Sequence, residues 1–393
     1  MQTNTTRVAY LDWLRIASIM GVLFFHSAMA YNEWGWHLKD SSRSDLLTVF
    51  TLTLHTFRMP LLFFISGTVS FFMVKRRTTG SFISLRLRRL FVPLLFGMLV
   101  IVPPQIYAER LTQGFHGSYW DFYPSVFKFI PYPAGSFSWH HLWFIFYLFV
   151  YDLVLAPFFT WSTSEKGRGF VRALGWFARG QRVFLLAIPS VVCFCALILR
   201  FPEETNDFAH DWCYVVYWMF FVLIGFIAIL QPALLDSLER NRRYSMTAAF
   251  LLMIFLIYVA FSQHTFGYLT LPLRPVVAWS WVFAALGYGK KYLNRKSPAL
   301  GYINQAVYPF YILHQTVIVI LVYFIIQTND GTAMKYFFTV AGTFAITMGI
   351  YHLIIRRIPV LRFLFGMKPD TSRPKAPVAR VEKPAFPNGI LVN

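Results

Sequence analysis

Long runs of hydrophobic residues, separated by short polar segments, follow one another along almost the whole chain. About ten of these runs approach the roughly 20 apolar residues that an α-helix needs to cross a bilayer. Because lipid offers no hydrogen-bonding partner to a peptide group, each run is expected to be helical. The pattern predicts an all-α, polytopic transmembrane helical bundle, with spans near residues 11–30, 46–74, 90–109, 142–161, 183–200, 213–230, 246–262, 275–289, 303–326 and 336–355.

The charged residues support this arrangement and orient it. Only 13% of the 393 residues are charged and 57% are hydrophobic, whereas a soluble domain carries about a quarter charged residues. Most of the 36 Lys and Arg residues fall in alternate loops, and in membrane proteins such loops face the cytoplasm. The distribution predicts that both termini are cytoplasmic, together with segments 75–89, 166–182, 240–243, 290–296 and 356–383.

The formal net charge of +19 would suggest a nucleic-acid partner in a soluble protein. Here the basic residues flank hydrophobic runs, so membrane lipids are the expected partner and no nucleic acid is expected. The three cysteines, Cys193, Cys195 and Cys213, lack metal-site spacing, so neither a metal nor a disulfide framework is expected. We expect a transmembrane domain over residues 1–358 and a cytoplasmic tail, partly disordered, over residues 359–393.

The first hydrophobic run contains three ionisable residues, Asp12, Arg15 and His26. Ionisable groups inside a span are costly, so each is a candidate functional residue. Eleven steps of about 100° bring His26 back to within roughly 20° of Arg15, about 16 Å along the helix axis. Arg15 would then lie near the cytoplasmic edge and His26 deeper, where imidazole suits general-base chemistry. The structural alternative is an interfacial Arg15 paired with Asp12, with His26 bonded to a neighbouring helix.

Three arginines further along the chain are also candidates. Arg58 is too costly to face lipid, so it should face the bundle interior, either in catalysis or in a buried ion pair. Arg86 and Arg89 are three residues apart and should project from one side of a helix, where paired guanidinium groups suit phosphate. The alternative is that they are ordinary basic loop residues. The Ser66-Gly67 pair near Arg58 is expected to be a close helix contact.

Other candidates lie in the later spans and the outer loops. His314 lies well inside its span and is expected either to share a cavity with His26 or to be a satisfied core histidine. His141, before Trp143, is placed at the outer mouth of the fourth span. Trp139 belongs to an aromatic outer loop over residues 111–141, which could stack on sugar rings or form an ordinary interfacial aromatic belt.

Several of these motifs together resemble the acyltransferase 3 family of integral membrane acyltransferases, and most closely its glucan biosynthesis protein C branch. The resemblance covers about residues 8 to 355. It is carried by the order and spacing of Tyr10-Leu11-Asp12-Trp13-Leu14-Arg15, of His26, of Phe57-Arg58-Met59-Pro60, of Arg86-x-x-Arg89, of His141-Leu142-Trp143-Phe144 and of Tyr308-Pro309-Phe310-Tyr311-Ile312-Leu313-His314.

The resemblance implies an acyl-CoA-dependent enzyme of the bacterial inner membrane that transfers an acyl group, succinyl in the glucan branch, to a carbohydrate hydroxyl on the outer side. It implies that His26 is the catalytic base and that Arg15, Arg86 and Arg89 hold the phosphates of CoA. Asp12, Arg58 and His314 complete the expected catalytic set, and Trp139, His141 and Trp143 the expected acceptor site. Asn304-Gln305 departs from the carboxylate expected in that branch.

Two other functional classes remain open on the sequence. A secondary transporter would also bury Arg, His and Asp residues near the middle of the bilayer, although no inverted repeat is visible in the sequence. A membrane scaffold without catalytic activity would tolerate replacement of the buried polar residues. The combined motifs favour the enzyme.

Overall fold

A computed structural model describes residues 8–75, 77–262, 270–295 and 297–368 of the chain. Within these residues the regular structure is helical, and the only strand-like feature is an isolated bridge between Pro131 and Phe137. The expected all-α class is therefore confirmed. The three cysteines are free. Most of the predicted tail, residues 369–393, lies outside the described residues.

Among the described residues, eight helical segments are long and apolar enough to cross a membrane. They are α1 (Ala9–Ala28), α2 (Asp45–Val74), Thr79–Thr112, His140–Ser162, α10 (Trp212–Leu230), α12 (Arg242–Phe261), α14 (Pro298–Ile325) and Thr332–Ile355. The other two expected spans are also helical, as the shorter apolar segment Arg182–Ile198 and as α13 (Leu273–Tyr292). Because α13 carries Arg274 at its start and Lys290 and Lys291 in its last turn, its apolar stretch is short.

The remaining elements are short or subdivide these segments. Segment His140–Ser162 consists of the 3-10 turn η4 (His140–Leu142) and α7 (Trp143–Ser162), and Thr332–Ile355 of α15 (Thr332–Ile350) and the π-helix η8 (Tyr351–Ile355). The connecting elements are α6 (Tyr119–Phe122), η3 (Tyr123–Lys128), η5 (Glu165–Gly167), α8 (Arg168–Leu174), η6 (Arg182–Ala187), α9 (Ile188–Ile198), α11 (Ala233–Arg240) and α16 (Pro359–Leu364).

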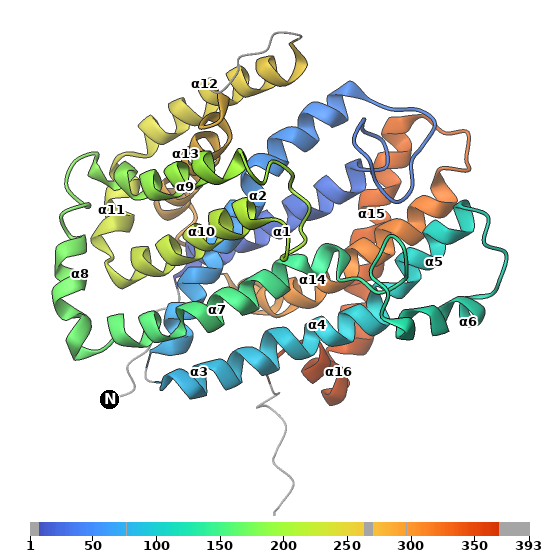
Figure 1. Cartoon of the computed structure of the whole chain (residues 1–393), viewed down its shortest axis with the longest axis horizontal. Helices are drawn as coiled ribbons and strands as arrows, with labels where there is room; N and C mark the ends of the chain where they lie inside the picture. Colours follow the sequence, from blue (N-terminus) through green and yellow to red (C-terminus); the bar gives the residue numbers. More distant parts are fainter. Residues whose placement is uncertain (1–7, 76, 263–269, 296, 369–393) are drawn as a thin grey trace, which may run out of the picture.

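Helices α2 and α10 pack closely against each other in the interior of the bundle (Figure 1). A Cβ atom on Gly67 would overlap the carbonyl oxygen of Val222, and one on Gly225 would overlap the carbonyl oxygen of Phe64. Small residues let helices approach at such crossings because no side chain separates the backbones. The close helix contact predicted at Ser66-Gly67 is therefore confirmed.

Helices α12 and α15 lie at the edge of the bundle and expose large apolar side chains (Figure 1). Only 22% of the most apolar window of α12 and 28% of that of Thr332–Ile355 is buried inside the protein. Exposed apolar surface of this kind suits lipid rather than water. The protein is thus an integral membrane protein whose polar residues lie within the bundle.

Segment Thr79–Thr112 is a continuous helix with two wide turns. It runs through α3 (Thr79–Arg86), the π-helix η1 (Leu87–Phe91), α4 (Val92–Phe96), the π-helix η2 (Gly97–Ile101) and α5 (Pro103–Thr112). Pro93 and Pro103 lack the amide hydrogen that a regular α-helix needs, so irregular turns near them are expected. These turns shape the side of the bundle on which the candidate site lies.

The two ends of the bundle are formed by different elements. The end that we call the distal end is formed by residues 29–44, the end of α5, α6 and the start of α7, on the right of Figure 1. The opposite, proximal end contains the start of α1, the end of α2, and α3 and α16 (Figure 1). The distribution of Lys and Arg predicts that the proximal end faces the cytoplasm.

Candidate functional site

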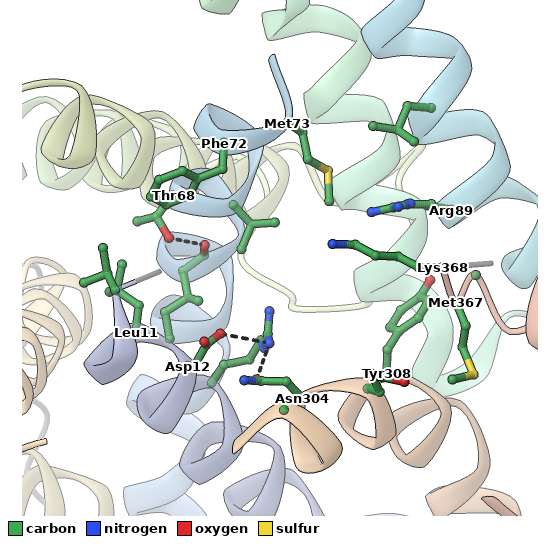
Figure 2. Close-up of a pocket in the computed structure, with 18 of the residues that line it drawn as sticks. Leu11, Asp12, Thr68, Phe72, Met73, Arg89, Asn304, Tyr308, Met367 and Lys368 are labelled. Carbon is green, nitrogen blue, oxygen red and sulfur yellow. Dashed lines mark hydrogen bonds and ion pairs between the residues drawn. The ribbon is translucent and has the colours of Figure 1, made fainter. Parts of the chain in front are cut away.

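A cavity of about 840 Å³ opens at the proximal end. Its lining comes from α1, α2, α14 and segment Thr79–Thr112, and from the residues around α16. Among the lining side chains is one carboxylate, Asp12, and five are basic, Arg15, Arg77, Arg89, Arg362 and Lys368. Figure 2 shows the side chains of Arg89 and Lys368 reaching into the same space from one side. A cavity with this charge balance suits a ligand that carries several phosphate groups.

Arg15 is held in this cavity by two oxygen atoms. Its Nη2 donates to Asp12 Oδ1 at 3.1 Å, one helical turn earlier, and to Asn304 Oδ1 on α14 (Figure 2). Asn304 belongs to the Asn304-Gln305 pair, at which the resemblance led us to expect a carboxylate, and both residues line the cavity. An amide oxygen orients the guanidinium group without cancelling its charge. The departure therefore leaves the cavity more cationic.

A second cavity, of about 190 Å³, continues from the first toward the middle of the bundle. The two cavities share eight lining residues, among them Arg15, Arg89, Asn304 and Tyr308. The inner cavity is mainly apolar and extends to Tyr311 on α14. The ring centroid of Tyr311 lies 5.5 Å from that of His314, one turn further along the helix. The two cavities therefore lead from the basic proximal end to the edge of a buried histidine cluster.

Arg86, which we grouped with Arg89 for phosphate binding, has a buried partner. Its guanidinium group forms an ion pair with Asp152 of α7, whose other oxygen accepts a hydrogen bond from Ser70 Oγ at 2.8 Å. The side chain of Arg86 is 4% exposed and that of Asp152 is 0% exposed. Arg86 lines the inner cavity but not the larger one. Its charge is thus balanced within the protein, whereas Arg89 lines both cavities.

His26 and His314 meet at the centre of the histidine cluster. His26 Nδ1 lies 2.8 Å from His314 Nε2. His141 packs against the same group, with its ring centroid 5.2 Å from that of His314. His141 Nε2 donates to the carbonyl oxygen of Ile312 at 2.9 Å, and Tyr311 donates its hydroxyl hydrogen to the carbonyl oxygen of His141. The structure therefore brings together three of the histidines selected from the sequence.

The hydrogen bonds of this cluster set the protonation pattern of His26. The nitrogen Nδ1 of His314 bonds to the carbonyl oxygen of Tyr311, which can only accept, so Nδ1 carries the proton. In a neutral ring, His314 Nε2 is then an acceptor, and His26 Nδ1 must donate to it. A neutral His26 therefore keeps its lone pair on Nε2. That is the form required of a general base.

Arg58 is buried beside His26 and stacks on an aromatic ring. Its guanidinium carbon lies 3.3 Å from the ring centroid of Phe25, and only 6% of the residue is exposed. The same guanidinium group, through Nη1, donates to His55 Nδ1 at 3.1 Å, and His55 Nε2 lies 2.9 Å from Glu204 Oε2. Arg58 thus faces the interior, as predicted, and connects the surroundings of His26 to the loop over residues 201–211.

The carboxylate of Glu204 completes this chain. Burial opposes its ionisation, but His55, Arg274 and Arg58 together outweigh burial and hold the pKa of Glu204 below its usual value. An ionised Glu204 balances the buried charge of Arg58 through His55. The sequence analysis did not select Glu204, because it lies in a loop outside the hydrophobic runs, where a charged residue is ordinary.

The three residues selected for acceptor binding do not share one open surface. His141 is 4% exposed and belongs to the histidine cluster. Trp139 donates its indole hydrogen to the carbonyl oxygen of Asn206 at 3.2 Å and stacks on Phe146. Trp143 packs against Trp218, with ring centroids 6.2 Å apart. Their acceptor-binding role stays a prediction.

Comparison with known proteins agrees with this geometry. A family model described as an acyltransferase domain, that of the acyltransferase 3 family, matches residues 8–352. The glucans biosynthesis protein C of Salmonella typhimurium strain LT2 is 23% identical over 381 residues, which cover 93% of this chain and 96% of that protein. The same protein from Salmonella heidelberg is 22% identical over the same shares of both chains. No solved structure matches significantly.

The family match extends over nearly the whole chain and includes Arg15, His26 and His314. The aligned region begins at the start of α1 and ends within η8. It therefore contains the helices α1, α2 and α14, which line the cavities, and the histidine cluster. The chain belongs to the acyltransferase 3 family and is an integral membrane acyltransferase.

Proposed function

We propose that this enzyme transfers an acyl group from cytoplasmic acyl-CoA to a hydroxyl group of a carbohydrate on the outer side of the bacterial inner membrane. The observation that carries the proposal is the basic proximal cavity, which continues inward to Tyr311, beside the His26–His314 pair. A nucleotide with several phosphates fits the basic end, and a narrow acyl-bearing arm fits the apolar inner cavity. The printed name of the relatives favours a glucan as acceptor, and succinyl is the acyl group that we propose.

In this proposal Arg15 and Arg89 hold the phosphates of the donor. Both line the two cavities, and Arg15 stands about 16 Å along α1 from His26. The charge of Arg86 is already balanced by Asp152, so Arg86 has a structural role in this proposal: its ion pair links α3 to α7. Arg77 and Lys368 add positive charge near the cavity mouth. Phosphate binding by these groups fixes the depth to which the thioester reaches.

His26 acts as the general base. Its Nε2 accepts the proton of the acceptor hydroxyl while the hydroxyl oxygen attacks the thioester carbonyl carbon. The new C–O ester bond forms, the C–S bond breaks, and the proton on His26 passes to the departing thiolate of CoA. General-base assistance is typically worth about 10² to 10⁴ in rate. Direct attack by His26, which would give an acyl-histidine intermediate, is the alternative route.

The buried Arg58 has a place in the same step. Negative charge develops on the carbonyl oxygen of the thioester during attack, and a buried cation next to His26 can stabilise it. Arg58 keeps its position through Phe25 and His55, so no reorganisation is needed during the reaction. This role makes Arg58 part of the catalytic machinery in the proposal.

The proposed donor site is tested by comparing neighbouring arginines. Arg89 lines both cavities, whereas Arg88 is exposed and lines neither. The purified protein is incubated with a series of acyl-CoA thioesters and a glucan oligosaccharide, and release of free CoA is measured. Arg89→Ala should raise the KM for acyl-CoA, while Arg88→Ala should leave it unchanged.

A donor lacking the 3′-phosphate of CoA provides a second comparison. If Arg89 contacts phosphate, removal of that group or of Arg89 weakens binding, and each loss of a charge-assisted hydrogen bond costs about 1.5–3 kcal/mol. Equal KM values for Arg89→Ala and Arg88→Ala would contradict the donor site. CoA release that does not depend on any carbohydrate acceptor would contradict the proposed reaction.

A further inference from the structure

Three residues from separate parts of the chain converge at the distal end of the bundle. His37 lies in the segment between α1 and α2, Glu109 near the end of α5, and His140 at the start of η4. One ligand atom from each residue lies within 4.8 Å of the ligand atoms of the other two. None of these residues has a part in the proposed transfer reaction. Two imidazoles and one carboxylate form a ligand set typical of zinc.

The closest pair of ligand atoms lies at hydrogen-bond distance, closer together than two ligands of one metal ion, so the pair must separate slightly when an ion binds. His37 Nδ1 lies 2.8 Å from Glu109 Oε2, and both side chains are largely buried, at 13% and 7% exposed. Tetrahedral zinc, with bonds of about 2.0–2.2 Å, holds its ligand atoms roughly 3.4 Å apart. The rings of His37 and His140 lie 4.7 Å apart and 3° from parallel, so binding requires them to tilt toward a common point. Side-chain rotation supplies such a movement without a change of the backbone.

His140 is prepared for binding by its other ring nitrogen. Its Nδ1 lies 2.7 Å from Ser138 Oγ, which leaves Nε2 as the ring nitrogen that a metal ion can use. The remaining nitrogen, Nε2, is buried and has no hydrogen-bond partner among the described residues. A buried polar atom without a partner is costly, so it needs an explanation. A metal ion bound to Nε2 would provide that partner. The Nδ1 contact with Ser138 then corresponds to the hydrogen bond that metal-ligating histidines characteristically make through their other ring nitrogen.

The backbone and the carboxylate of the cluster are also constrained. His140 has φ of 42°, in the left-handed region that side chains other than glycine rarely adopt. Such backbone strain persists where the surroundings enforce it and often accompanies binding sites. Glu109 Oε1 accepts hydrogen bonds from Tyr132 Oη at 2.8 Å and from Gln113 Nε2 at 3.2 Å, which leaves Oε2 directed toward His37. Second-sphere bonds of this kind are characteristic of metal sites.

We propose that His37, Glu109 and His140 bind a divalent transition-metal ion of the zinc type, with a fourth position open to water. Calcium and magnesium are disfavoured, because both prefer oxygen ligands. The ion would tie the 29–44 segment to α5 and to the start of α7, next to His141 of the histidine cluster. The sequence analysis expected no metal because it considered cysteine spacing, whereas these ligands are separated by 72 and 31 positions in the chain.

The test measures the metal itself and does not depend on catalysis. Full-length protein in detergent is dialysed against Zn²⁺, washed, and its metal content is measured by mass spectrometry. The wild type should retain about one ion per chain. His140→Ala and Glu109→Gln should retain almost none. The matched control is His210→Ala, which removes another distal histidine, whose side chain is 81% exposed, and it should retain the wild-type content.

A second measurement guards against misfolded variants. Glu109→Gln keeps the size of the side chain, and each variant is first checked by size-exclusion chromatography. Ser138→Ala, which leaves all three ligands in place, should weaken zinc affinity by about 10- to 100-fold. Substitution of Co²⁺ should give the visible absorption of a tetrahedral site. Wild-type protein that retains no zinc, or well-folded Glu109→Gln that retains as much as His210→Ala, would overturn the proposal.

Discussion

Replacement of His314 is the most informative perturbation of the histidine cluster. His314 Nε2 accepts from His26 Nδ1 at 2.8 Å, and this bond places the free lone pair of His26 on Nε2. In the proposed transition state His26 becomes positively charged, so the bond to His314 strengthens as the proton is taken. His314→Ala removes this support while leaving the base itself in place.

The expected loss follows from the energy of one hydrogen bond to a charged group. Such a bond contributes about 1.5–3 kcal/mol. Because each 1.36 kcal/mol of activation free energy changes the rate tenfold, His314→Ala should lower kcat by roughly 10- to 150-fold. The KM for acyl-CoA should change little, because His314 lines neither cavity. His314→Gln, which retains an accepting oxygen, should recover part of the rate.

The assay follows free CoA release in detergent with saturating acyl-CoA and a glucan oligosaccharide. His352→Ala is the matched control, because His352 bonds to Tyr302 Oη at 3.0 Å and lies far along the chain from the cluster, in η8. A wild-type kcat for His314→Ala would refute the proposed support of His26 by this hydrogen bond. A loss in His314→Ala that exceeds the loss in His26→Ala would make His314 the base instead.

Three further predictions concern the bundle that supports the site. Arg86→Ala leaves Asp152 buried without its cation and should destabilise the protein by about 3–5 kcal/mol, measured by thermal unfolding in detergent, and Arg86→Ala/Asp152→Asn should recover part of the loss. Gly67→Ala should cost about 1–3 kcal/mol in the same assay, whereas Gly349→Ala, where a Cβ meets nothing within 4 Å, should not destabilise; equal effects would contradict the close crossing. Burial raises the pKa of Asp211 from 3.8 to about 7, so the folded protein holds this proton more tightly than the unfolded chain does. The resulting stability is fully present below about pH 4 and is lost as the pH rises through about 7; Asp211→Asn should flatten this dependence, and an unchanged pH profile would contradict it.

The sequence predicted the helical class and the common face of Arg15 and His26 because both depend on local periodicity. Eleven residues of α-helix bring two side chains to the same side whatever surrounds them. Arg15 lines both cavities, and His26 contacts His314. The number of spans was harder to predict, because α13 combines a short apolar stretch with charged ends. The ten expected segments are all helical, and eight of them meet the length and composition of a span.

Contacts between distant segments could not be predicted from one sequence. Arg86 and Arg89 look alike in the chain, but only Arg86 meets Asp152, from a helix 66 residues away. An aspartate inside an apolar run was itself a signal of a buried partner, and the sequence analysis did not use it. The convergence of His37, Glu109 and His140 left no periodic pattern, because three separate segments supply the ligands.

The most direct test of the proposed chemistry is product formation by His26→Ala. Purified wild type, His26→Ala and His352→Ala are incubated with succinyl-CoA and a glucan oligosaccharide, and the acylated carbohydrate is quantified by mass spectrometry. His26→Ala should lose at least about 100-fold in rate while folding normally, and His352→Ala should match the wild type. Equal product from His26→Ala and wild type would contradict the assignment of His26 as the base.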